Sequence, residues 1–157
     1  MPIKLGDNAP DFTLKDTDRN DRSLKEFLGK KIVLAFFPGA FTGVCTKEMC
    51  TFRDSLSNLS GLNAQIVAVS VDSPFSNKAF ADANGLKFPV LSDYNRDAIK
   101  KYGIVHDGFA GLKGYTAAFR SVFVLDKDGI VKYAWVSENP GVEPRYDEVM
   151  KALASFN

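Results

Sequence analysis

The stretch Lys31–Cys45, KIVLAFFPGAFTGVC, decides how this chain folds. Its first part, Lys31–Phe37, is apolar and carries β-branched residues, and Gln65–Val71 (QIVAVSV) has the same character. Continuous apolar runs of this length are typical of strands that are buried on both faces of a parallel sheet. The segment between them, Thr42–Leu59, has apolar residues at helical spacing, so we expect a strand–helix–strand unit.

Turn and cap residues divide the rest of the chain into shorter elements. Ser73 and Pro74 are typical of the first positions of a helix, and Gly85 is typical of a helix end. Asp126–Gly129 separates two apolar runs and predicts a β-hairpin, because Gly129 suits the positive φ of such a turn. The other expected elements are an extended piece at Phe88–Leu91, a helix at Asn95–Tyr102 ended by Gly103, hairpin strands at Ser121–Leu125 and Ile130–Trp135, and a last helix at Glu143–Ser155.

This order of elements predicts an α/β protein with a thioredoxin-like fold. We expect a mixed central sheet with helices on both faces. An N-terminal extension before Lys31 carries the apolar residues Phe12, Leu14 and Phe27. No repeat, low-complexity stretch or linker interrupts the sequence, so residues 1–157 are expected to form a single domain.

The composition argues against several classes of function. Lys and Arg number 20 against 19 Asp and Glu, which gives no electrostatic signature of nucleic-acid or anionic-membrane binding. No apolar run reaches the ~20 residues that a membrane span needs. The segment Met1–Asp7 lacks the features of a signal peptide, so we expect a cytoplasmic protein.

Metal and disulfide sites also find little support in the composition. Two cysteines and one histidine, His106, are too few for a disulfide framework, for four thiolate ligands or for several histidine ligands. We therefore expect no metal and no cofactor. We assign His106 to the surface or to a loop and give it no role.

Cys45 is the first candidate for chemistry. It follows a buried strand and falls in the first turn of the expected helix, where free N–H groups and the helix dipole favour a thiolate. The end of a strand in an open α/β sheet is also where such folds place their sites. The alternative is a small buried core residue, which is the usual role of a lone cysteine in an apolar stretch.

Three neighbours of Cys45 favour a reactive thiol over a core residue. Thr42 can direct its hydroxyl at the sulfur, although it can equally cap the helix. Pro38 fixes the chain where it leaves the strand, although it can equally just end that strand. Glu48 lies one turn after Cys45 and can hold a cation near the sulfur, although it can equally be a solvated charge.

Taken together, Pro38-x-x-x-Thr42-x-x-Cys45 resembles the active-site motif of the peroxiredoxins. Gly6-Asp7-Asn8-Ala9-Pro10-Asp11-Phe12 resembles the N-terminal opening of that family, and Arg120 matches its second active-site position. The order and spacing of these pieces cover most of the chain.

The resemblance implies a thiol-dependent peroxidase that reduces hydrogen peroxide and alkyl hydroperoxides. Cys45 would be the peroxidatic nucleophile, and Arg120 would stabilise the charge that moves from sulfur to the leaving oxygen. Thr42 and the backbone N–H groups of Val44 and Cys45 would add donors, and Glu48 would orient the arginine. Val44, Phe41 and Phe119 are expected to line the substrate pocket. The family likeness also implies a homodimer and a thioredoxin-like or other thiol reductant.

Cys50 follows Cys45 by five positions in the same expected helix. In an intact helix their Cα atoms would lie roughly 8–9 Å apart, beyond the ~7 Å limit for a disulfide. The spacing resembles the bacterioferritin-comigratory (PrxQ) branch, in which the second cysteine resolves the first, whereas Trp135–Val149 looks more like the AhpE branch. The helix would then have to unwind during turnover. The alternative is a one-cysteine enzyme that an external thiol reduces, with Cys50 as an ordinary helix residue.

Two rival functions fit the same fold. A thioredoxin-type disulfide oxidoreductase needs a closer pair of cysteines and a proline just before the hairpin, where residues 115–121 have none. A redox-regulated holdase or interaction module needs no peroxidase chemistry at all. Consumption of peroxide separates these alternatives.

Overall fold

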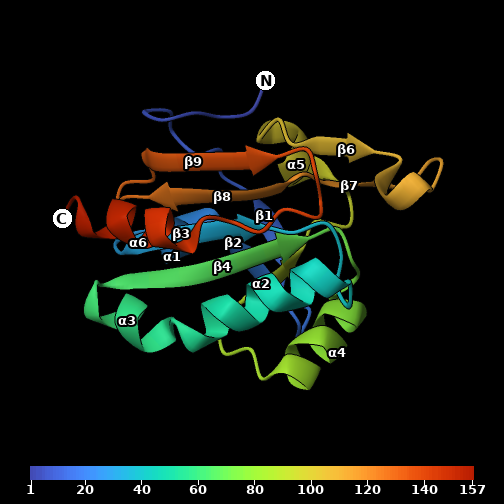
Figure 1. Cartoon of the computed structure of the whole chain (residues 1–157), viewed down its shortest axis with the longest axis horizontal. Helices are drawn as coiled ribbons and strands as arrows, with labels where there is room; N and C mark the ends of the chain where they lie inside the picture. Colours follow the sequence, from blue (N-terminus) through green and yellow to red (C-terminus); the bar gives the residue numbers. More distant parts are fainter.

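The computed structural model describes residues 1–157, with a seven-stranded mixed sheet at its centre (Figure 1). The strands lie in the order β2-β1-β5-β4-β3-β8-β9. Their bounds are Thr13–Lys15 for β1, Asp21–Ser23 for β2, Lys31–Phe36 for β3, Ala64–Ser70 for β4, Val90–Ser92 for β5, Arg120–Leu125 for β8 and Val131–Ser137 for β9. The predicted thioredoxin-like α/β fold with a mixed sheet is confirmed.

Strand β3 is the centre of the sheet. It pairs in parallel with β4, from Lys31 opposite Ala64 to Phe36 opposite Val69, and antiparallel with β8 on its other side. Residues 32–37 and 66–70 are buried throughout, which explains why both segments are apolar without alternation. The predicted hairpin is present between β8 and β9, and Gly129 in its turn has φ of 85°.

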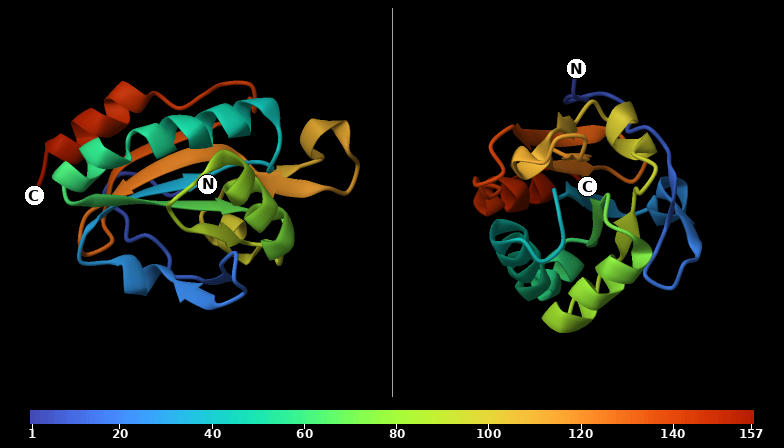
Figure 2. Two further views of the ribbon diagram at one scale, coloured as in Figure 1. Left: turned by 90° about the horizontal axis from the view of Figure 1, so that it is seen from below. Right: turned by 90° about the vertical axis from the view of Figure 1, so that its right-hand side faces the viewer.

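Helices cover both faces of the sheet (Figure 2). One face carries α2 (Gly43–Asp54), α3 (Leu56–Gly61), α4 (Pro74–Asn84) and α6 (Tyr146–Ala154). The other face carries the N-terminal segment with α1 (Leu24–Phe27), together with α5 (Asp97–Lys101). Helix α4 begins and ends as predicted, because Ser73 accepts a hydrogen bond from Ser76 N–H and Gly85 adopts a left-handed φ of 61°.

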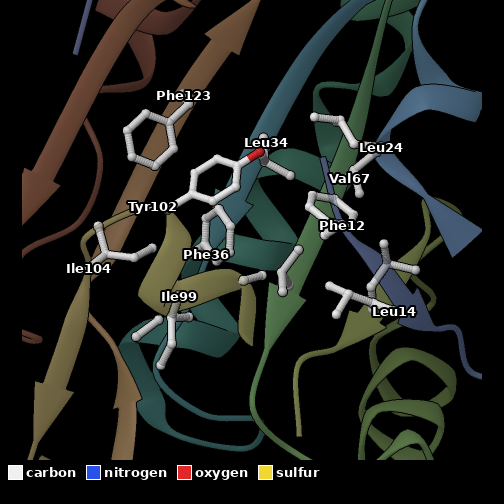
Figure 3. Packing of buried hydrophobic residues seen from close by; sticks show 14 of the residues in the cluster. Phe12, Leu14, Leu24, Leu34, Phe36, Val67, Ile99, Tyr102, Ile104 and Phe123 are labelled. Atoms are coloured by element: carbon white, nitrogen blue, oxygen red, sulfur yellow. The ribbon is translucent and has the colours of Figure 1, made fainter. Parts of the chain in front are cut away.

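The core beneath α5 is organised around Tyr102, which lies between Phe36 and Phe123 (Figure 3). Its ring centroid is 5.0 Å from that of Phe36 and 5.7 Å from that of Phe123. Its hydroxyl donates to the carbonyl of Pro10 at 2.7 Å, so the one polar atom of this ring is satisfied. This bond fastens the N-terminal extension, including Phe12, to the face of the sheet.

Some boundaries differ from those expected. The single helix predicted over Thr42–Leu59 is divided at Ser55, whose hydroxyl donates to the carbonyl of Thr51 and whose N–H turns back to Phe52. The strand expected at Phe88–Leu91 is β5 at Val90–Ser92, and the last helix begins at Tyr146, after the proline at 144. None of the helices is both long and apolar enough to cross a membrane.

A small two-stranded sheet was not predicted. It joins β6 (Val105–Asp107) to β7 (Thr116–Ala118) and projects beyond the main sheet, with the 3₁₀ turn η1 (Phe109–Gly111) near its tip (Figure 1). His106, which we expected at the surface or in a loop, lies in β6 and is half-buried. Its ring stacks on Phe119 at 4.9 Å and meets Phe109 edge-on at 5.7 Å.

Candidate active site

The sheet register brings Cys45 and Arg120 together. Phe36, the last residue of β3, pairs with Ser121, so Arg120 begins β8 at the edge where the chain leaves β3 for α2. Cys45 is the third residue of α2 and faces the same edge. The two side chains therefore meet at the carboxyl end of the central strand, where open α/β sheets place their sites.

Arg120 is the hub of a buried polar cluster. One guanidinium nitrogen, Nη2, donates to Cys45 Sγ at 3.2 Å and to the carbonyl of Pro140 at 2.9 Å. The other, Nη1, donates to Glu48 Oε1 at 2.6 Å. Arg120 is 1% exposed, and Cys45 and Glu48 are fully buried. A planar fork of donors suits this task, because one cation reaches the sulfur and the carboxylate at once.

The pKa of the Cys45 thiol reflects opposing influences. Burial is the largest and raises it, while the Arg120 charge, the Thr42 hydroxyl and the Gly39 backbone N–H act in the opposite direction. The sequence indicates only groups that favour the thiolate, whereas burial in the folded chain outweighs them and raises the pKa of Cys45. The thiolate in this site thus depends on Arg120 and its neighbouring donors.

Glu48 is the counter-charge of this cluster. Burial raises its pKa to about 7, against the opposing influence of Arg120. Its second oxygen, Oε2, and the Nε of Arg120 are buried without a hydrogen-bond partner. The pair consequently holds the guanidinium in place at a cost in desolvation.

Thr42 and Pro38 lie where the motif requires them. Thr42 is at the N-cap position of α2, yet its hydroxyl makes no cap hydrogen bond and donates to the carbonyl of Gly39 at 2.9 Å. The hydroxyl also lies close enough to Cys45 to lower the pKa of the thiol, so its one proton can serve either acceptor. Pro38 is buried at the end of β3.

An open cavity of about 330 Å³ adjoins this cluster. Of the three residues predicted to line it, Val44 does so. Phe41 is 59% exposed and packs edge-on against Phe80, and Phe119 stacks on His106. The lining residues that the sequence did not indicate are Gly43, Phe109, Ala110, Pro140 and Gly141. Another cavity, of about 320 Å³, lies beside β1 and β5 and contains no thiol.

Cys50 lies in the same unbroken helix as Cys45, and both thiols are free. It is partly exposed, and its Sγ donates to Asn84 Oδ1 at the end of α4, 3.5 Å away. No group of three or more His, Cys, Asp or Glu side chains is arranged to hold a metal ion. The site itself holds a buried thiol beside a cation fixed by hydrogen bonds.

Comparison with known proteins assigns the family. The AhpC/TSA family profile matches residues 5–134. The chain is a peroxiredoxin. It is 39% identical to the chloroplastic peroxiredoxin Q of Populus jackii over 98% of this chain and 70% of that protein. The chloroplastic peroxiredoxin Q of Sedum lineare is also 39% identical, over 98% of this chain and 80% of that protein.

Solved structures give the same assignment. The peroxidoxin BcpB of Mycobacterium tuberculosis superposes with a TM-score of 0.86 at 30% identity, over 99% of both chains. Peroxiredoxin Q of Xanthomonas campestris superposes with a TM-score of 0.80 at 27% identity, over 92% of this peroxiredoxin and 90% of that chain. This peroxiredoxin is accordingly a thiol-dependent peroxidase, with relatives of the Q and bacterioferritin-comigratory type.

Proposed function

We propose that Cys45 is the nucleophile of this peroxidase. Its thiolate attacks one oxygen of a hydroperoxide, the O–O bond breaks, and the other oxygen leaves as an alkoxide or hydroxide that takes up a proton. Sulfur is oxidised to sulfenic acid while the peroxide is reduced to an alcohol or water. The observation that carries this proposal is the 3.2 Å contact between Arg120 Nη2 and Cys45 Sγ inside a buried cluster.

Arg120 stabilises the charge that moves during this step. Negative charge begins on sulfur and ends on the leaving oxygen, so a cation that faces both stabilises the transition state. Glu48 and the Pro140 carbonyl hold the guanidinium in its orientation, at 2.6 and 2.9 Å respectively. Thr42 and the free N–H groups at the start of α2 supply further donors, while Pro38 shields the strand end.

Cys50 is proposed as the resolving thiol. It attacks the sulfur of the Cys45 sulfenic acid, water leaves, and an intramolecular disulfide forms. Because both cysteines lie in α2, the first turns of this helix must unwind. Sulfenic acid is neutral at sulfur, so oxidation weakens the attraction to Arg120 that holds Cys45 in place. The contacts of these turns outside the cluster are weak: the partly exposed Lys47–Glu143 ion pair contributes about 1 kcal/mol or less, and the Cys50 thiol donates to Asn84.

A thioredoxin-like dithiol is the proposed reductant that returns the disulfide to two thiols. We propose a cytoplasmic setting, because reduced thiols persist there. A homodimer is proposed as well. Its support is a set of exposed apolar residues on the loops around the cavity, namely Phe41, Leu112 and Val142.

Two variants test the roles of the cysteines. In an assay with dithiothreitol as reductant, Cys45→Ser is expected to abolish peroxide consumption; retained turnover would show that Cys45 is not the nucleophile. Mass spectrometry after one equivalent of peroxide should show loss of two hydrogens in the wild type and a sulfenic acid in Cys50→Ser. A wild type that stops at sulfenic acid would favour the one-cysteine enzyme.

A further inference from the structure

Asp72 connects the end of β4 to the active-site loop. Its Oδ2 accepts a hydrogen bond from the backbone N–H of Ala40 at 2.8 Å. Ala40 lies in residues 38–42, the loop that carries Pro38 and Thr42 between β3 and α2. No other hydrogen bond joins this loop to β4 or to the segment that follows β4. Asp72 makes no hydrogen bond to Cys45, so a positional effect on the thiol must pass through the loop.

The Asp72 carboxylate is itself fixed by buried polar groups. Ser70 Oγ lies 2.9 Å from Asp72 Oδ2 and 3.0 Å from the Asn77 side chain. Ser92 Oγ donates to the Asp72 backbone carbonyl. Ser70 and Asn77 are fully buried and Ser92 is 1% exposed. These hydrogen bonds to buried side chains restrict how Asp72 can be arranged, which gives its carboxylate a defined position.

The loop needs such an anchor, because its backbone turns sharply. The Ala40 N–H points to Asp72, and two residues later Thr42 lines the cavity beside Arg120. Phe41 then takes a left-handed conformation with φ of 64°, which is unfavourable for a bulky residue. A strained turn relaxes when its anchor is removed, and the loop groups that lower the pKa of the Cys45 thiol, Thr42 and Gly39, would move with it.

We propose that Asp72 is a positioning residue of this peroxidase: by holding the Ala40 N–H, it keeps the loop that carries Pro38 and Thr42 in place beside Cys45. The inference rests on the proposed role of Cys45 as the reacting thiol. The charge of Asp72 would act in the opposite sense, because a nearby anion disfavours a thiolate. When Asp72 is replaced, the loss of its positioning role should therefore raise the pKa of Cys45, whereas the loss of its charge should lower it.

Measuring the ionisation of Cys45 against pH separates the positional effect of Asp72 from the effect of its charge. It is followed by thiolate absorbance against pH in a Cys50→Ser background, which leaves one thiol, and the rate of reaction with hydrogen peroxide is measured by stopped flow. In Asp72→Ala we expect the midpoint to move to higher pH and the rate at neutral pH to fall by about tenfold. Asp72→Asn, which keeps an acceptor oxygen, should recover most of the rate. A midpoint that stays or moves to lower pH would overturn the proposal.

Asp72→Glu covers the case in which the alanine variant does not fold. It keeps the charge but displaces the carboxylate by one methylene, so only a positional role predicts a higher midpoint and a slower reaction. Asp93 provides the matched control. It too follows a strand and binds backbone N–H groups, those of Ala98 and Ile99, and its carboxylate makes no hydrogen bond to the loop. Asp93→Asn is therefore expected to lower stability without moving the Cys45 midpoint.

The same experiment distinguishes failure of this inference from failure of the proposed function. If Cys45→Ser consumes peroxide as the wild type does, Cys45 is not the reacting thiol. If Cys45→Ser is inactive while Asp72→Ala and Asp72→Glu behave like the wild type, the role assigned to Asp72 is wrong.

Discussion

Replacing Glu48 with glutamine is expected to change how the free energy of unfolding depends on pH. The folded protein raises the pKa of this carboxyl to about 7 from an ordinary value of 4.5. The folded state therefore holds the Glu48 proton more tightly than the unfolded state does. Its contribution to stability is fully present below pH 4.5 and is lost as the pH rises through 7.

The size of this effect follows from the gap between the two pKa values. A gap of this size corresponds to about 3 kcal/mol in full, of which roughly 2 kcal/mol is lost between about pH 5 and about pH 7.5. Solvent screening does not reduce this free energy, since Glu48 is fully buried. Glutamine does not titrate, so in Glu48→Gln this part of the pH dependence disappears while the contact with Arg120 keeps an acceptor oxygen.

The assay is urea unfolding at these two pH values and constant ionic strength, in a background with Cys45→Ser and Cys50→Ser, which removes thiol titration and oxidation. The free energy of unfolding of the parent should fall by roughly 2 kcal/mol relative to that of the glutamine variant between the lower and the higher pH. Parallel profiles, within about 0.5 kcal/mol, would refute the reasoning, because Glu48 would then remain ionised throughout.

Three further substitutions test the site and the core. Arg120→Lys is expected to slow the reaction with peroxide by roughly 10²-fold in stopped flow, because an ammonium group lacks the planar fork of donors that reaches Cys45 and Glu48 together. A loss of rate below about threefold would contradict this role of the guanidinium. Phe109→Ala should lower kcat/KM for cumene hydroperoxide and leave kcat/KM for hydrogen peroxide unchanged, because only the organic group reaches the Phe109 ring. The exposed Leu112, changed to alanine, is the control, and equal losses for both peroxides would refute the prediction. Phe123→Ala should lower the free energy of unfolding by about 3–5 kcal/mol in urea titrations, since the ring is fully buried; a loss below about 1 kcal/mol would contradict that packing.

The central strands could be predicted because a strand that is buried on both faces is a continuous run of apolar residues in the sequence. Lys31–Phe37 and Gln65–Val71 are such runs, and both contain central strands. The strands β6 and β7 show no such run, because each has three residues and only one neighbouring strand. Residues 105–107 and 116–118 were therefore missed, and with them the position of His106.

The site was predicted where residues share one motif or one helix face, and less well where side-chain direction decides. Cys45 and Glu48 are one helical turn apart, and the structure places both beside Arg120. Phe119 was expected in the pocket because it precedes Arg120, but successive residues of an extended chain point to opposite sides, and its ring turns to His106. Phe109 and Pro140 come from loops, where spacing predicts no direction.

The Arg120–Cys45 contact joins residues 75 positions apart, and the Pro140 carbonyl that supports it lies another 20 positions along the chain. During synthesis the thiol thus leaves the ribosome before its cation exists. At about 5–20 residues per second the interval is roughly 4–15 s, during which Cys45 is an ordinary cysteine on a growing chain. Under the proposed role of Cys45, its full reactivity toward peroxide would arise only when β8 pairs with β3, late in the folding of the chain.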